Sequence, residues 1–126
     1  MRPITLAQVA ELATRGGSFD RSLANFLDEF YSAPSASALA QEPISLAPRF
    51  ADLGRVQDAY LAAAAEELAR QFNLQRPTWI DAEIRKLHRP WFASKLAALR
   101  AVLLLESPAA FRSRNLFVSE NALVRV

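Results

Sequence analysis

Few residues in this sequence are suited to acid–base or metal chemistry. His88 is the one histidine, and cysteine is absent. A Ser-His-acid triad needs that histidine beside a serine and a carboxylate. One histidine does not make a zinc site with carboxylates of ordinary spacing. We expect His88 to lie at the C-terminal end of a helix and to interact with the last carbonyl groups.

Two pairs of adjacent carboxylates, Asp28-Glu29 and Glu66-Glu67, are also poorly placed for catalysis. Neighbouring residues on a helix point about 100° apart, so the members of a pair do not converge on a shared proton. Gly16-Gly17 lacks the lysine and the preceding strand of a phosphate-binding loop. The sequence therefore predicts no catalytic residue, no metal site and no cofactor, and we expect a protein that is not an enzyme.

Aromatic and basic residues gather between residues 76 and 92. Trp79 and Trp91 each follow closely on a proline and an arginine at the start of a predicted segment. Protein interfaces use tryptophan and arginine as anchors. Alternatively, the tryptophans close the core at corners between helices, with arginine stacked on their rings. Trp79, Arg89, Trp91 and Phe92 are candidate partner-binding residues.

A second cluster lies in residues 106–118. Arg112 and Arg114 flank a predicted turn, and Phe117 follows it. One interpretation is a structural ion pair between Glu106 and Arg112 across the Ser-Pro corner. The other is an exposed arginine fork that meets the carboxylates of a partner or a phosphate. Arg112, Arg114 and Phe117 complete the candidate partner-binding set.

Capping residues and helical periodicity predict the elements that position these clusters. Thr5 begins a first helix, with Gln8 completing a capping box. Gly16-Gly17 ends that helix. Ser18 or Asp20 begins a second helix, to about residue 31, whose apolar residues recur at three- and four-residue steps.

Residues 32–51 contain three prolines and are predicted to be a long irregular connection on the surface, with one helical turn around residues 37–41. Asp52 is the predicted cap of the longest helix, which runs to about Phe72. Its face is rich in small residues, Ala62–Ala65, which let a neighbouring helix approach closely. Asn73 is the predicted stop, because asparagine tolerates the left-handed backbone.

Thr78 is the predicted cap of a short helix that reaches Leu87. Ser94 is the predicted cap of the next helix, over residues 94–105. Apolar residues cover most of its circumference, so it is predicted to be the central buried helix. They are Leu96, Leu99, Val102, Leu103 and Leu105.

Ser107 is predicted to cap a further one or two turns, with Pro108 at the first helical position and Asn115 as the stop. Residues 116–118 are β-prone but very short, and Ser119 is predicted to cap a last turn. The elements add up to an all-α fold. It is a single compact domain over residues 1–126, with about six helices and a short irregular C-terminal tail.

Composition places this domain in a broad class. The 126 residues are 52% hydrophobic, enough for a core, and 22% charged, which argues against disorder. The absence of cysteine favours a reducing compartment. The first residues lack the apolar core of a signal peptide and the longest apolar runs are too short for a bilayer, so we expect a cytoplasmic protein without membrane contact.

Charge is distributed unevenly along the chain. Residues 1–69 hold five Lys/Arg and nine Asp/Glu, whereas residues 70–126 hold ten and four. The acidic and basic halves can complement each other within the fold or between copies. The basic half can equally meet an acidic partner or a phosphate backbone. The alanine-rich helix and the many apolar residues also make a homodimer a reasonable expectation.

The C-terminal residues resemble a group of small bacterial helical proteins that we associate with nucleotidyltransferase-like toxin–antitoxin modules. The tail of that group reads much like Glu-Ser-Pro-x-x-Phe-Arg-x-Arg-x-Phe-Val-x-x-x-Ala-Leu. The likeness touches nearly the whole chain, and the tail is its specific part. This chain has Asn73 where a glycine would be expected after the long helix. The similar segments are 18–28, 90–92, 99–105 and 106–126.

This resemblance implies an antitoxin that neutralises a cognate nucleotidyltransferase-type toxin by direct binding. It does not supply binding residues. The alternative is a nucleic-acid-binding regulator that uses the basic C-terminal half. Residues 5–30 could be drawn as two helices around a turn, but Asp20, Asp28 and Glu29 outweigh Arg21 on the second helix. That is the wrong sign for a helix that faces phosphates.

Overall fold

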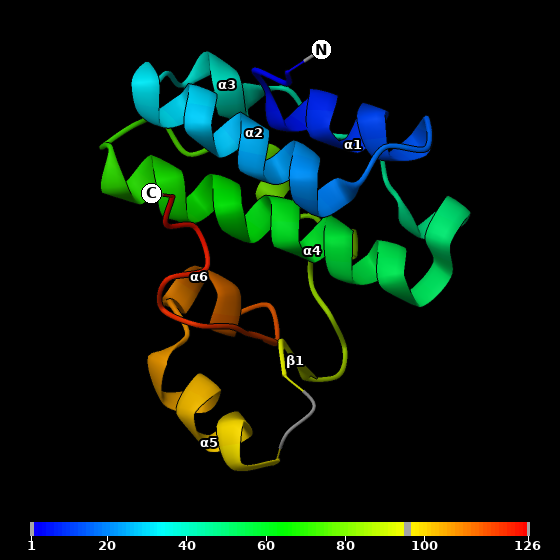
Figure 1. The fold of residues 1–126 in the computed structure, drawn as a ribbon, viewed down its shortest axis with the longest axis vertical. Helices are drawn as coiled ribbons and strands as arrows, with labels where there is room; N and C mark the ends of the chain where they lie inside the picture. Colours follow the sequence, from blue (N-terminus) through cyan, green and yellow to red (C-terminus); the bar gives the residue numbers. More distant parts are fainter. Residues whose placement is uncertain (1, 95–96, 126) are drawn as a thin grey trace.

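The structure, a computed structural model, describes residues 2–94 and 97–125. Within these residues it has six α-helices and one parallel sheet of two short strands (Figure 1). The all-α class with about six helices is therefore confirmed. The α-helices are α1 (Leu6–Thr14), α2 (Phe19–Ser32), α3 (Ser37–Ala40), α4 (Ala47–Gln71), α5 (Ala97–Glu106) and α6 (Ala109–Arg112). Two 3-10 helices, η1 (Thr78–Asp81) and η2 (Glu83–Arg85), precede strand β1 (Trp91–Phe92), and strand β2 (Leu116–Phe117) follows α6.

The two N-terminal helices begin where their capping residues predict. The Thr5 side chain accepts a hydrogen bond from the Gln8 backbone N–H, and Ser18 accepts one from that of Arg21. The Gln8 side chain reaches back to the backbone N–H of Ile4, one residue before the expected partner. Gly16, with a φ of 91°, ends the first helical segment in a conformation that favours glycine.

Helix α4 is the centre of the molecule. Figure 1 shows α1, α2 and α3 on one side of α4, and α6 with β1 on the other. All four residues of Ala62–Ala65 are fully buried, so their small side chains let helices pack closely from both sides. The prediction that residues 94–105 form the central buried helix is wrong. In α5, Leu103 is buried, but Leu99, Val102 and Leu105 are exposed. Leu96 lies outside the described residues.

Helix α4 begins at Ala47, before the predicted Asp52, and contains a kink at Ala51 (φ 54°, ψ −124°). Pro48 is in its first turn, where the missing N–H costs no helical hydrogen bond. The chain folds back tightly here, since a Cβ at Gly54 would lie 2.2 Å from the carbonyl oxygen of Leu46. Sequence patterns treat Pro48 as a break, so they place the start of the helix too late.

Residues 32–51 are more ordered than a surface connection. Helix α3 occupies the predicted turn, and both Leu39 and Leu46 are completely buried. The carboxylate of buried Asp58 accepts hydrogen bonds from the Ser45 hydroxyl and from the backbone N–H groups of Leu46 and Ala47. One side chain of α4 therefore fixes the segment that leads into α4.

The second half differs from the prediction in its local structure. Residues 78–87 form two 3-10 turns without a side-chain cap, where one short helix was predicted. The N-cap of α6 is Pro108, and the Ser107 hydroxyl instead donates within the core to Leu103 and Val118 carbonyls and accepts from the Val118 N–H. The described part of α5 is Ala97–Glu106, and residues 95 and 96, which separate it from the predicted cap Ser94, lie outside the described residues.

Left-handed residues stop the helices as predicted. Asn73, after α4, has a φ of 53°, and Asn115, after α6, has a φ of 62°. The C-terminal tail then returns across α4 toward α2 (Figure 1). The hydroxyl of Tyr31 donates to the Leu123 carbonyl at 2.7 Å, which holds the tail against α2.

Candidate partner-binding surface

Trp79 belongs to the core. It is 7% exposed, and its indole N–H donates to the Leu39 carbonyl at 2.9 Å. The guanidinium of Arg85 lies 4.9 Å from its ring centroid. The structure therefore removes Trp79 from the partner-binding set and places it as a corner residue with a stacked arginine.

Arg114 is also a structural residue. It is 2% exposed and donates to the carbonyls of Ala110 at 2.7 Å and Ile80 at 3.1 Å. Its guanidinium forms an ion pair with Glu66 at 2.8 Å. These contacts tie α6 to η1 and α4, so the predicted exposed arginine fork does not include Arg114.

The predicted ion pair between Glu106 and Arg112 does not form among the described residues. Arg112 is exposed, and its guanidinium donates to the Ser107 carbonyl at 3.2 Å. The carboxylate of Glu106 accepts from the backbone N–H of Glu120 at 3.3 Å. Arg112 therefore keeps most of its donors free for a partner.

Arg85 is an important residue that the sequence analysis missed. It is fully buried, donates to the Pro43 carbonyl at 2.6 Å, and lies 3.7 Å from Asp58 and 3.6 Å from Glu42. Burial lowers the pKa of Arg85, while the two carboxylates oppose that change. Its neighbours Ile84 and Lys86 are exposed, so local sequence carries no signal of its burial.

The two short strands bring the remaining aromatic candidates together. Trp91 pairs with Leu116, and Phe92 pairs with Phe117. The rings of Phe92 and Phe117 are stacked with centroids 5.0 Å apart. Phe117 is buried beneath the Phe92 ring and is not available to a partner, whereas Trp91 and Phe92 are half-buried. The Arg100 guanidinium lies 5.1 Å from the Phe92 ring centroid, which links α5 to β1.

The outward face of α5 is apolar. Leu99, Val102 and Leu105 recur at three-residue steps and therefore share one side of the helix, and they are 44%, 46% and 85% exposed. Figure 1 shows α5 at the far end of the molecule from α1 and α3. We call these three residues the α5 face.

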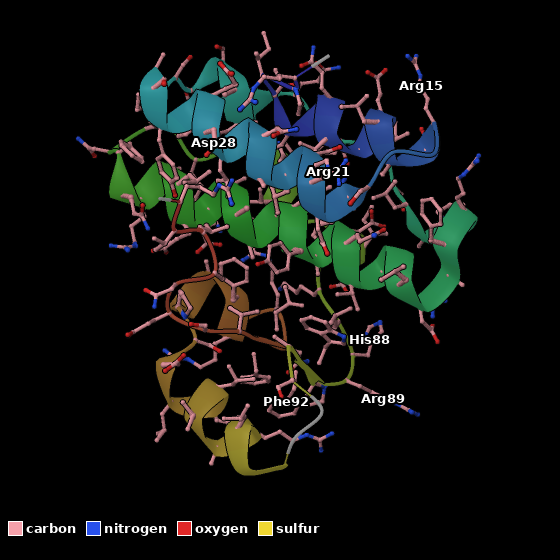
Figure 2. The ribbon with its side chains drawn as sticks, in the orientation of Figure 1. Arg15, Arg21, Asp28, His88, Arg89 and Phe92 are labelled. Atoms are coloured by element: carbon pink, nitrogen blue, oxygen red, sulfur yellow. The ribbon has the colours of Figure 1, made fainter. Side chains whose placement is uncertain are left out.

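Exposed basic side chains lie in α5 itself and in the segments on either side of it in the sequence. Figure 2 shows Arg89 pointing away from the body near β1, with Phe92 closer to α5. Lys86, His88 and Arg89 are exposed and form no salt bridge among the described residues. The pKa of Asp81 is lowered first by a hydrogen bond from Arg76 and to a smaller extent by the charge of Lys86. His88 lies in a bend, so the prediction that it ends a helix is wrong. Arg100 and Arg112 add two more exposed cations at the helix and just after it.

A metal centre and a membrane-spanning helix are not found in the part of the chain that the structure describes. No three His, Asp or Glu side chains lie close enough to hold a metal ion within residues 2–94 and 97–125. Over the same residues, none of the helices combines the length and the apolar character that crossing a bilayer requires.

Comparison of the chain with protein-family models, with curated proteins and with solved structures returns no match.

Proposed function

We propose that this chain is an antitoxin-like protein that binds an acidic protein partner through the α5 face. The observation that supports the proposal is the exposure of Leu99, Val102 and Leu105 on one side of a helix whose described charged residues are Arg100 and Glu106. A helix that is apolar around its circumference is normally buried, and an exposed apolar patch is typical of a protein contact site. A partner protein would bury the apolar side chains of α5 that the chain itself leaves exposed to solvent.

The charges around the α5 face favour a partner with carboxylates at the edge of its contact surface. Arg89, Arg100 and Arg112 are exposed and can each donate several hydrogen bonds to carboxylate groups. A second copy of the chain would bring the same cations against one another, so self-association through this face is disfavoured. Phosphate-handling enzymes carry acidic metal-binding residues, which agrees with the nucleotidyltransferase-type toxin that the resemblance implies.

Co-expression of the tagged chain with the product of the neighbouring gene tests the proposal. We expect a stable complex at micromolar concentration and relief of growth arrest. Leu105→Glu places a charge at the most exposed position of the α5 face and should weaken the complex by at least about tenfold, as substitutions at interface anchors do. Circular dichroism of the free variant checks that it stays folded.

Ile44→Glu is the matched control, because Ile44 is 51% exposed but lies outside α5. It should bind as the unchanged chain does. The proposal fails if no complex forms at micromolar concentration, or if Leu105→Glu and Ile44→Glu bind the partner equally well.

Nucleic-acid binding is the second candidate, and the exposed basic side chains of Lys86 and Arg89, which form no salt bridge among the described residues, favour it. Phosphate contacts make affinity fall steeply with salt. A mobility shift with duplex DNA or tRNA at two salt concentrations therefore tests it, with Arg89→Gln expected to reduce the salt dependence. The apolar residues of the α5 face have no use in such a complex, so Leu105→Glu should leave it unchanged.

A further inference from the structure

A groove of about 510 Å³ opens between α2, α4, β1 and the C-terminal tail. This volume is in the range of small-molecule sites. No residue of α5 lines the groove, so it is separate from the proposed partner contact. Apolar side chains form most of its wall, among them Leu23, Leu27, Val56, Val118 and Ala122.

Three aromatic residues from different elements also line this groove. They are Phe19 at the start of α2, Tyr60 in α4 and Trp91 in β1. Phe19 and Tyr60 meet edge to face, with ring centroids 6.5 Å apart. Aromatic ring faces attract cations, and tryptophan does so most strongly. Several rings around one cavity are the usual arrangement for an ammonium group that is removed from water.

The polar groups that line the groove also favour a positively charged ligand. The side-chain oxygen of Gln57 is buried without a hydrogen-bond partner, which is costly unless a ligand or water donates to it. Asp20 lines the groove and makes no ion pair among the described residues. Burial and the charge of Asp20 raise the pKa of Tyr60 to about 12, so its ring carries a neutral hydroxyl. Arg125 is the one lining cation, and Asp28 already neutralises it through contacts of 3.0 and 3.3 Å.

We infer that this groove binds a small organic cation, namely an ammonium group on an apolar framework. The ammonium N–H groups donate to the Asp20 carboxylate and, after the Gln57 side chain turns toward the groove, to its oxygen. The rings of Phe19, Tyr60 and Trp91 surround the positive charge, and the apolar wall takes the framework. This site does not depend on the proposed antitoxin role.

Nuclear magnetic resonance of the full chain tests the inference, because its two tryptophans give two indole N–H signals. Trp91→Phe assigns them. The probes are 2-phenylethylammonium, the neutral 2-phenylethanol and the anionic 3-phenylpropionate. We expect the cation to shift the Trp91 signal in a saturable way, to leave the Trp79 signal in place, and to bind at least about tenfold more tightly than the alcohol. The anion should cause no shift.

Asp20→Asn should weaken binding of the cation about tenfold and leave binding of the alcohol unchanged. Asp52→Asn is the matched control, since Asp52 is an exposed residue of α4 that does not line the groove. Gln57→Met should weaken the cation as well, because it removes the buried acceptor. Thermal unfolding of each variant verifies that it folds.

Three results would overturn the inference. One is the absence of a Trp91 shift at cation concentrations up to about 10 mM. The dissociation constant would then be higher than a specific site of this size should give. Another is equal affinity for the three probes. The third is an equal effect of Asp20→Asn and Asp52→Asn. The Leu105→Glu variant should still show the Trp91 shift on addition of the cation. Loss of partner binding in that variant is therefore distinguishable from loss of cation binding.

Discussion

Arg85 and Arg114 carry their charges into the interior of the molecule. Each donates to two backbone carbonyls and faces at least one carboxylate, so neither charge is left alone. Such groups are costly to disturb, because removal of one partner leaves the others buried and unsatisfied. Their effect is to join distant segments, and Arg114 connects α6 with η1 and α4.

Arg114→Met should therefore lower the free energy of unfolding by about 3 kcal/mol, measured by urea denaturation. The carbonyls of Ala110 and Ile80 would lose their donor. Arg112→Met is the control two residues earlier, on an exposed side chain, and should change stability by less than about 0.5 kcal/mol. Similar losses in the two variants would contradict the structural role of Arg114.

Tyr60 gives a prediction for alkaline pH. Burial and then the charge of Asp20 raise its pKa to about 12, above the ordinary 10.0. As the pH rises, Tyr60 loses its proton in the unfolded chain before it does so in the folded chain. Its contribution to the free energy of unfolding should therefore be fully present below pH 10 and should be lost as the pH rises toward 12. Absorbance titration should show one tyrosine ionising near pH 12. Tyr60→Phe should remove that step, and the idea fails if it persists.

The sequence could predict only part of the candidate site. The residue types were sufficient to select Trp79, Trp91, Phe92 and Arg114, but not to tell an anchor from a core residue. Trp79 and Arg114 are buried by contacts with residues 40 and 34 positions away. Local spacing contains no information about such contacts.

At the scale of elements, the sequence predicted α1 and α2 well because their signals are local. Caps, the Gly16 stop and three- to four-residue periodicity all lie within one segment. Local signals were not sufficient to decide whether α4 or the helix at residues 94–105 is the central helix. An apolar circumference is equally consistent with burial inside the chain and with burial against a partner. In α4 the buried surface is made of alanines, whose small size hides how completely they are enclosed.

The kink of α4 provides a test at this scale. Ala51 has a φ of 54° and a ψ of −124°, a conformation that glycine adopts without strain and alanine does not. Ala51 is exposed, so its methyl group contributes little burial. We expect Ala51→Gly to raise the free energy of unfolding by about 1 kcal/mol. Thermal denaturation measures the change.

Ala24→Gly is the control for that substitution, because Ala24 lies inside the regular helix α2. Glycine there should cost about 1 kcal/mol through its greater freedom in the unfolded chain. Destabilisation by both substitutions would mean that the backbone at residue 51 is not strained.

Across the whole molecule, the acidic and basic halves of the sequence complement each other within the fold. Ion pairs join Arg114 and Arg76 to Glu66, Arg85 to Asp58 and Glu42, and Arg125 to Asp28. Each pair links residues 70–126 to residues 1–69. Within residues 70–126, Lys86, Arg89, Arg100 and Arg112 form no salt bridge among the described residues, and Figure 2 shows Arg89 near β1, whereas the unpaired Arg15 and Arg21 lie at the opposite end. The excess positive charge of the C-terminal half is therefore available where the partner contact is proposed.

The ion pair of Arg125 and Asp28 joins the two halves of the sequence, since it holds the C-terminal tail against α2 (Figure 2 labels Asp28). The hydrogen bond from Arg125 is the main cause that holds the pKa of Asp28 below its ordinary 3.8, and burial opposes it. Ionised Asp28 therefore stabilises the fold at pH values above the pKa that this carboxyl has in the unfolded chain. This contribution is lost as the pH falls through the lower pKa that Asp28 has in the folded chain.

Arg125→Met should accordingly be less stable than the unchanged chain at pH 7, and the two should converge as Asp28 becomes protonated well below its ordinary pKa of 3.8. Urea denaturation at a series of pH values measures the difference. Arg15→Met is the control, because Arg15 is exposed and has no carboxylate partner among the described residues. Its small effect should not follow the protonation of Asp28. A constant difference for Arg125→Met from pH 7 into the acid range would show that the tail is held by the Tyr31 hydrogen bond and by packing, without a contribution from this charge pair.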